Sequence, residues 1–328
     1  MAALKRIVLI NSFGMQVDIL NFGARIAAIK FPVNGQPTDM ILSYDDNEDY
    51  LNDAFYLGAT CGRVCNRIDQ ASFSIAGREY VLEKSDGENC LHGGIDTFAH
   101  RYWQVTHQSP QAVTLVLHSA DGDQGFPGAV DIQVTYTLTD DNALTIDFVA
   151  NTNMATPINL TNHAYFNLGE ADARSLTLQI NAPHYLALNK RNIPTGELVP
   201  VANTDFDFNT ARVIGAVEAT THDAQVIERR GFDHCFALVK RLPEQPAATL
   251  TSAKNQLSMT LYTDQKAVQL YSGAYLSTPF QAYQGLCLEA QNFTDAVNHP
   301  SFPNTVLEPA QQYRQRIAFA FTAHDVSS

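Results

Sequence analysis

The chain contains little cysteine, little positive charge and no long apolar run. Its 328 residues include 5 Cys, and 21 Lys and Arg stand against 34 Asp and Glu, which gives a formal charge of −13. An acidic balance argues against nucleic acid and anionic membrane partners, because both attract a basic surface. Apolar residues make up 45% and charged residues 17%, a composition typical of a globular protein with a sizeable core.

The sequence also shows no pattern typical of a membrane span or a signal peptide. No apolar run approaches the roughly 18 residues that indicate a membrane span. The N-terminal apolar stretch Ile7–Ile10 gives way at once to Asn11-Ser12, which is too short for the core of a signal peptide. The cysteines are odd in number and unclustered, so we expect reduced thiols and a cytoplasmic protein.

Several motifs with well-understood chemistry are missing. The sequence has no Gly-x-Gly-x-x-Gly after a strand, no phosphate-binding Gly-x-x-x-x-Gly-Lys-Ser/Thr, no His-Glu-x-x-His and no Gly-x-Ser-x-Gly. Cys61 and Cys65 form a Cys-x3-Cys pair and Cys90 lies near His92, but the spacing is not that of a zinc finger. We therefore expect neither a metal nor a cofactor.

The most frequent pattern in the sequence is the alternation of apolar and polar residues. Val130–Leu138 places apolar residues at every second position, a turn cluster follows, and Leu144–Phe148 resumes the pattern, which predicts a hairpin with one buried face. Similar runs occur at 15–20, 73–82, 112–118, 176–180, 257–262, 267–272 and 315–321. The pattern predicts an all-β protein, a large antiparallel β-sandwich, as a single domain over residues 1–328. Residues 47–53 could form a short helix, and 191–221 read as a long surface excursion.

Polar residues interrupt this pattern in several segments. Leu286, Leu288 and Ala290 share one face of a predicted strand, which leaves Glu289 on the other face as a candidate acid or base. Each segment also has an ordinary structural explanation: a strand edge, a tight turn or a satisfied polar network. The segments are Gly62–Ile68, Asn89–Gly94, Asn159–Asn167, Gly231–Cys235 and Gly285–Pro300.

Taken together and in order, these segments resemble the aldose 1-epimerases, also called galactose mutarotases. The residues that carry the resemblance are Gly62-Arg-x-x-Asn-Arg-Ile68, Leu91-His-Gly-Gly94, Thr161-Asn-His-x-Tyr-Phe-Asn-Leu168, Gly231-Phe-Asp-His234 and Glu289-x-Gln-Asn-Phe-x-Asp-Ala-Val-Asn-His-Pro300. The match runs over almost the whole chain.

The resemblance implies a fold, a reaction and a set of residues. The fold is the supersandwich, and the reaction interconverts the α and β anomers of free aldohexoses such as galactose and glucose without a cofactor. Glu289 would be the general base at the C1 hydroxyl and His163 the general acid at the ring oxygen. Phe293 would offer an aromatic face, and the residues that would hold the sugar are Asn66, Arg67, His92, Asp233 and Gln269.

Two alternatives belong to other classes. A glycoside hydrolase could recruit Asp233 and Glu289 as its pair of carboxylates, but it would leave His163 without a role. A non-catalytic sugar-binding or sensing protein would keep Arg67 and Asp233 and would not need Glu289 or His163. We expect a small sugar as the partner, no nucleic acid or membrane, and a monomer or homodimer.

Overall fold

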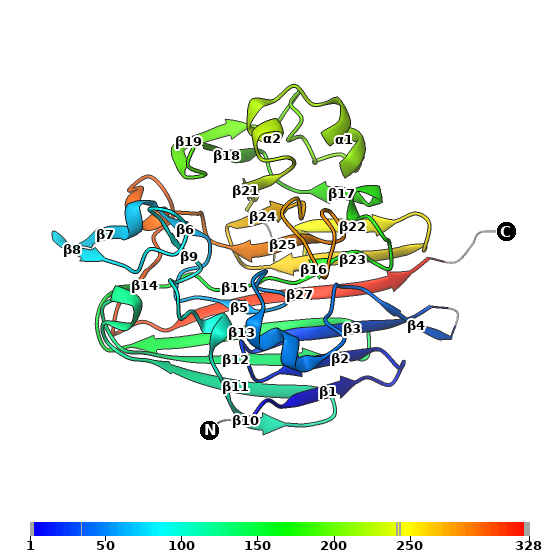
Figure 1. Cartoon of the computed structure of the whole chain (residues 1–328), viewed down its shortest axis with the longest axis horizontal. Coiled ribbons are helices and arrows are strands. Elements are labelled where there is room, and N and C mark those ends of the chain that lie inside the picture. Colours follow the sequence, from blue (N-terminus) through cyan, green and yellow to red (C-terminus); the bar gives the residue numbers. More distant parts are fainter. Residues whose placement is uncertain (1–2, 34, 241, 243, 325–328) are drawn as a thin grey trace.

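The computed structural model describes residues 3–324 except 34, 241 and 243, and it is built from antiparallel sheets (Figure 1). This confirms the all-β prediction. The largest sheet has the strand order β10 (Gln104–Gln108), β11 (Ala112–Ser119), β12 (Val130–Leu138), β13 (Ala143–Thr152), β27 (Tyr313–Ala323), β23 (Leu257–Thr263), β22 (Ala248–Ser252), β17 (Thr177–Ile180) and β20 (Arg212–Val213).

Period-two alternation explains how this sheet buries one face. In β12 the residues at 130, 132, 134, 136 and 138 are at most 1% exposed, whereas their neighbours face outward. The predicted hairpin is present, with Val134 opposite Phe148 in the register of β12 and β13. The C-terminal strand β27 lies between β13 and β23, so the last strand of the chain joins two halves of the sheet.

Two smaller sheets cover the buried face. One consists of β1 (Arg6–Ile10), β2 (Gln16–Leu20), β3 (Arg25–Val33) and β4 (Gln36–Asp39). The other has the order β16 (Tyr165–Phe166), β25 (Leu286–Gln291), β24 (Ala267–Tyr271), β21 (Asp233–Ala237), β18 (His184–Leu188) and β19 (Pro194–Pro200).

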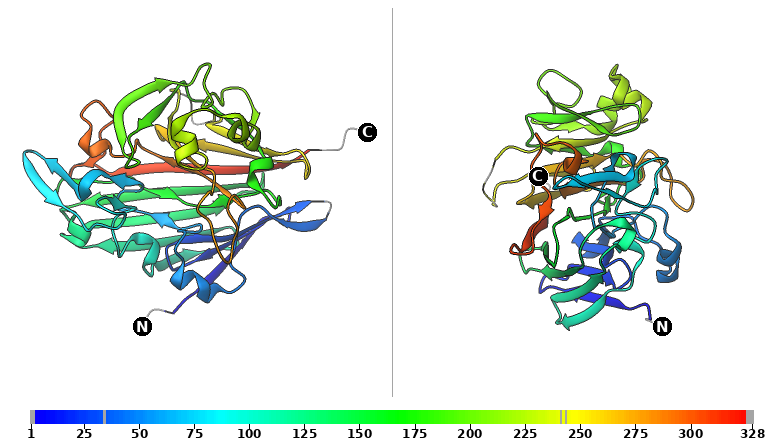
Figure 2. Two further views of the ribbon diagram at one scale, coloured as in Figure 1. Left: turned by 45° about the horizontal axis from the view of Figure 1, so that its top comes forward. Right: turned by 90° about the vertical axis from the view of Figure 1, so that its left-hand side faces the viewer.

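Aromatic contacts join both smaller sheets to β27. The ring of Phe31 in β3 lies 6.3 Å from that of Phe321, and the ring of Phe166 in β16 lies 4.8 Å from that of Phe319. The result is the predicted sandwich, seen from two further sides in Figure 2.

Short elements complete the fold. Two-stranded ladders pair β14 (Thr156–Pro157) with β26 (Val306–Leu307), β5 (Thr60–Cys61) with β15 (Thr161–Asn162), β6 (Arg67–Ile68) with β9 (Cys90–Leu91), and β7 (Ser72–Ile75) with β8 (Arg78–Val81). The short helix expected near 47–53 is a 3₁₀ turn, Asn47–Asn52. No helix in the described part of the chain is long and apolar enough to cross a membrane.

The prediction of a surface excursion over 191–221 was wrong. This stretch contains β19, β20 and most of α1 (Ile214–Thr220), and α2 (Ala224–Glu228) follows it. Phe206 and Phe208 within it are at most 1% exposed, and the Phe206 ring stacks 3.8 Å from that of Tyr185. The many Asn, Thr and Asp residues form turns between these buried residues. The buried residues therefore do not alternate regularly along the sequence, so the alternation pattern did not predict them.

Candidate active site

A polar cavity of about 430 Å³ opens beside the six-stranded sheet, a volume that suits a small ligand. It collects side chains from β6, β9, β21, β24 and β25 and from the segment between β15 and β16. Its lining residues are Ala54, Phe55, Tyr56, Asn66, Arg67, Asp86, Leu91, His92, His163, Tyr165, Asn192, Asp233, Tyr271, Tyr275 and Glu289. Six of the seven residues predicted from the sequence therefore meet in one place.

Glu289 reaches the cavity from the middle of β25. Its neighbours Leu288 and Ala290 face the core, as the alternation predicts. The carboxylate is 2% exposed, and its Oε2 has no hydrogen-bond partner among the described residues. Burial raises the pKa of Glu289 well above its usual value, the nearby Asp233 raises it further, and Arg67 opposes both. An unpartnered buried carboxylate is costly and is therefore a candidate for chemistry.

His163 lies next to this carboxylate. It sits between the short strands β15 and β16, and its Nε2 is 3.7 Å from Oε1 of Glu289. Its other ring nitrogen, Nδ1, lies 3.4 Å from Sγ of Cys287. Burial lowers the pKa of His163 to about 4 and raises the pKa of Glu289 well above its usual value, so it shifts both groups toward their uncharged forms. The two groups lie close enough to exchange one proton between them through a bound ligand.

The second histidine is held by main-chain contacts. Gly93 has φ +95°, and a Cβ there would meet the carbonyl oxygen of Gly62 at 2.2 Å, so only glycine allows these two segments to lie so close. This approach places His92 against Asn66, whose backbone N–H donates to Nδ1 of His92 at 3.2 Å. Nδ1 is thus an acceptor, and the ring proton of neutral His92 belongs on Nε2.

A charged group forms the adjacent wall. Arg67 donates from Nε to Asp86 at 2.7 Å and from Nη1 to Asp233 at 3.5 Å. Gln269 donates from Nε2 to Oδ1 of Asp233 at 2.6 Å. Gln269 itself is not among the residues that line the cavity, although it lies opposite Glu289 in the register of β24 and β25. Its contact therefore orients Asp233.

The prediction that Phe293 offers an aromatic face to the sugar was wrong. Phe293 is 8% exposed and packs its ring 5.2 Å from that of Phe302, outside the cavity. Tyr56 lines the cavity instead, with its ring 4.6 Å from that of His92. Phe293 does not reach the cavity because it packs in a small apolar cluster with Phe302 and Ala296.

Sequence reasoning also missed lining residues that carry no motif of their own. These are Asp86, which pairs with Arg67, Asn192 from the turn between β18 and β19, and the tyrosines at 56, 165, 271 and 275. Only the alternation of β24, which sets Tyr271 and Gln269 on one face, could have indicated any of them.

One group of three residues in the described part of the chain could hold a metal ion. Potential ligand atoms of His92, His163 and Glu289 lie within 4.8 Å of one another. A metal on Nε2 of a histidine requires the ring proton on Nδ1, where it is normally donated to an acceptor. In His92 the Nδ1 position faces the N–H donor of Asn66, so this ring does not fit a metal ligand.

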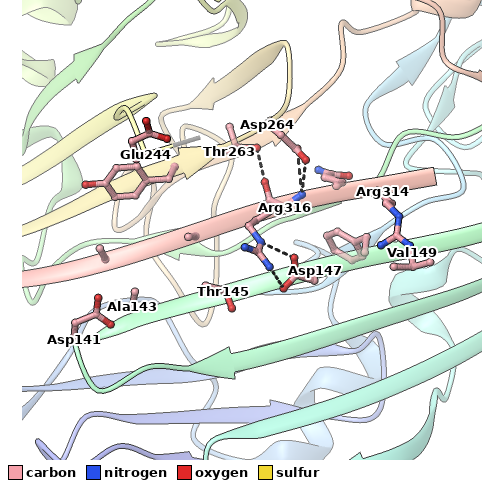
Figure 3. Close-up of a pocket in the computed structure, with 15 residues that line it drawn as sticks. Asp141, Ala143, Thr145, Asp147, Val149, Glu244, Thr263, Asp264, Arg314 and Arg316 are labelled. Atoms are coloured by element: carbon pink, nitrogen blue, oxygen red, sulfur yellow. Dashed lines mark hydrogen bonds and ion pairs between the residues drawn. The ribbon is translucent and has the colours of Figure 1, made fainter. Parts of the chain in front are cut away.

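A larger groove of about 840 Å³ lies on the outer face of the nine-stranded sheet (Figure 3). Arg316 is already paired: it donates from Nε to Asp147 at 2.7 Å, and its backbone N–H donates to Asp264 at 3.1 Å. The floor of the groove consists of outward-facing residues of β13 and β27 such as Thr145 and Ala318. Among the described residues that line the groove, none has a buried side-chain polar atom without a partner, so the smaller cavity is the candidate active site.

Comparison with known proteins identifies relatives of the chain. The sequence profile of the family described as aldose 1-epimerase matches residues 5–320. The aldose 1-epimerase of Escherichia coli (strain K12) is 36% identical over 326 residues, which cover 95% of this chain and 94% of the relative. The human galactose mutarotase is 35% identical over 320 residues, with 94% and 91% of the two chains covered.

Solved structures agree with these sequence relatives. An aldose epimerase homologue from C. elegans superposes with a TM-score of 0.93 at 28% identity and covers 98% of this chain and 100% of its own. The galactose 1-epimerase from Lactobacillus acidophilus gives a TM-score of 0.87 at 30% identity, covering 98% and 95%.

Proposed function

The chain belongs to the aldose 1-epimerase family and is an isomerase of this kind, and from this premise we propose that Glu289 and His163 interconvert the α and β anomers of free galactose and glucose. The observation that carries the proposal is the 3.7 Å separation of His163 Nε2 and Glu289 Oε1 at the base of a polar cavity. The C1 hydroxyl and the ring oxygen are bonded to the same carbon, so one bound sugar can present both oxygens to this pair.

The reaction needs one proton on the pair. Ring opening begins with Glu289 ionised and His163 protonated: the carboxylate takes the proton of the C1 hydroxyl and the imidazolium gives its proton to the ring oxygen. Glu289 then carries the proton and His163 is neutral, and burial shifts the pKa values of both groups toward this arrangement. After rotation about C1–C2 the same groups act in reverse and close the ring on the other face.

The wall beside this pair recognises the sugar hydroxyls. Asn66, Arg67, His92 and Asp233 present donors and acceptors to an uncharged polyol, and Gln269 orients Asp233. Tyr56 offers the apolar ring face on which a pyranose can lie. No step of this proposal requires a metal or a cofactor.

We also propose that the protein works in the cytoplasm. All five cysteines are free and buried, which supports a reducing compartment such as the cytoplasm. We further propose that the protein works as a monomer or homodimer on one small sugar at a time.

Polarimetry tests the proposed function. Freshly dissolved α-D-galactose and α-D-glucose should reach their equilibrium rotation faster with the protein than without it, and exhaustive chelation should leave the rate unchanged. An activity that is lost on chelation and restored by zinc would contradict the cofactor-free reaction. Release of a free sugar from a glycoside would favour a hydrolase, and sugar binding without any acceleration would favour a sensor.

Replacing Arg67 by alanine should raise KM for galactose by about tenfold or more, because a charged hydrogen bond contributes about 1.5–3 kcal/mol. Arg67→Lys should recover little of this loss, since one ammonium group cannot reproduce the contacts of the guanidinium with both Asp86 and Asp233. Steady-state kinetics by polarimetry would measure both variants. Arg78→Ala, at an exposed arginine outside the cavity, is the control, and an unchanged kcat and KM in Arg67→Ala would exclude this role.

A further inference from the structure

The two histidines of the site differ in the group that contacts Nδ1, the ring nitrogen on the side opposite Nε2. Nδ1 of His92 accepts from the backbone N–H of Asn66, and a backbone N–H can only donate. Nδ1 of His163 faces the side chain of Cys287 at 3.4 Å. A thiol can act as a weak donor or a weak acceptor, depending on its rotation.

Cys287 is built into the sheet at this position. It lies two residues before Glu289 on β25, on the same face, and pairs with Tyr165 of β16 and Tyr271 of β24. Cys287 is fully buried and His163 is 6% exposed. Burial raises the pKa of the Cys287 thiol well above its usual value, so the sulfur keeps its proton. The thiol therefore stays uncharged, and its sulfur can accept from an N–H group of the ring.

We propose that Cys287 is a positioning residue that makes His163, rather than His92, the ring that exchanges a proton. The sulfur of Cys287 accepts from Nδ1–H, so the proton that stays on the ring lies on Nδ1, and Nε2, which faces Oε1 of Glu289, is the nitrogen that gives and takes a proton. The sulfur accepts from Nδ1–H in the imidazolium and also in the neutral ring that remains after Nε2 has lost its proton. Both states of the ring therefore have the same partner.

His92 has no such freedom. Protonation of its Nδ1 would set two N–H groups against each other at 3.2 Å, so the main chain of Asn66 holds His92 as a neutral donor through Nε2. His92 can bind a sugar oxygen in this state but cannot cycle between two protonation states. The inference rests on the proposed function, because it concerns which ring acts as the acid.

Kinetics of three variants test the inference in the full-length protein. Cys287→Ala removes the partner of Nδ1 and should lower kcat about 3- to 10-fold with KM within about twofold, the range expected for one weak hydrogen bond. Cys287→Ser keeps a rotating donor and acceptor and should recover part of the loss. Cys235→Ala removes a thiol that is equally buried on neighbouring β21 and should match the wild type.

Nitrogen NMR of histidine-labelled protein measures which ring nitrogen of His163 carries the proton. This tautomer would not change if Cys287 had only a structural role. In sugar-free wild type the neutral His163 ring should carry its proton on Nδ1, and Cys287→Ala should convert it to a mixture of both tautomers. A proton on Nε2 in the wild type, or an unchanged kcat and tautomer in Cys287→Ala, would overturn the inference. If Cys287→Ala does not fold, Cys287→Ser decides by the same spectrum. Failure of the wild type to accelerate mutarotation would reject the proposed function and leave the tautomer result standing.

Discussion

Glu289→Gln should bind galactose yet lose about a thousandfold or more in kcat, because removal of a general base has effects of this order. Glutamine keeps the size of the side chain and can still face Nε2 of His163, which lies 3.7 Å from Oε1 in the wild type. It cannot take a proton from the C1 hydroxyl. Loss of kcat with KM nearly unchanged would separate chemistry from binding.

His163→Asn should reduce kcat to a similar extent, and the pair should behave as a unit. Polarimetry of both single variants and of the double variant measures this directly. The double variant should be little worse than either single one, because neither group can complete the proton transfer alone. Losses that multiply would show that the two residues act independently, and near-wild-type turnover in Glu289→Gln would refute the mechanism.

Thermal unfolding controls for misfolding of Glu289→Gln. Burial raises the pKa of Glu289 in the folded protein, so the folded state binds more protons than the unfolded chain between the two pKa values. The stability that this proton contributes is complete below the unfolded pKa of about 4.3 and is lost as the pH rises through the folded pKa. Glutamine does not titrate, so the Tm of Glu289→Gln should exceed that of wild type by a margin that grows from acidic to alkaline pH.

Asp53→Ala should lower the free energy of unfolding by about 3–5 kcal/mol, because it leaves a buried arginine without its counter-charge. Arg25 and Asp53 both have fully buried side chains, and Arg25 donates to Asp53 at 2.8 Å. Asp53 also accepts the backbone N–H groups of Phe55 and Leu57, at 3.0 and 2.7 Å. The substitution therefore loosens the segment that carries Tyr56 into the cavity.

Urea unfolding measures this effect, and the chain offers a matched control. Asp147→Ala removes the acidic partner of Arg316, whose side chain is 62% exposed, and exposed pairs contribute only about 0–1 kcal/mol. A loss of several kcal/mol is large against the typical total of about 5–15 kcal/mol. Equal midpoints for Asp53→Ala and Asp147→Ala would show that the buried pair contributes no more than an exposed one.

Sequence reasoning succeeded where a residue's place follows from its own strand. The alternation around Leu288 set Glu289 on the face opposite the core, and the structure has it there. It could not say what that face meets, because the partners come from several other segments, and those of His163 and Arg67 lie more than a hundred residues away. His163 reaches the cavity only because β15 pairs with β5 and β16 pairs with β25.

The residues that were missed or wrongly placed by the sequence analysis also have physical explanations. Asp86 looked like an ordinary turn residue, and its role as the partner of Arg67 depends on how β6 and β9 pair. Phe293 looked available because an aromatic residue beside a catalytic strand can turn either way, and it turns into an apolar cluster. The segment with Phe206 looked superficial because its buried residues follow no fixed period.

The position of β27 has a consequence for the synthesis of the chain. Residues 313–323 leave the ribosome after both of the strands they pair with, β13 on one side and β23 on the other. Until then both strands present open backbone edges, and such edges are templates for pairing with other chains. Contacts between residues so distant in sequence also slow folding. A nascent chain of this protein is therefore exposed to aggregation until β27 emerges, and we expect removal of β27 to yield insoluble protein rather than a smaller folded one.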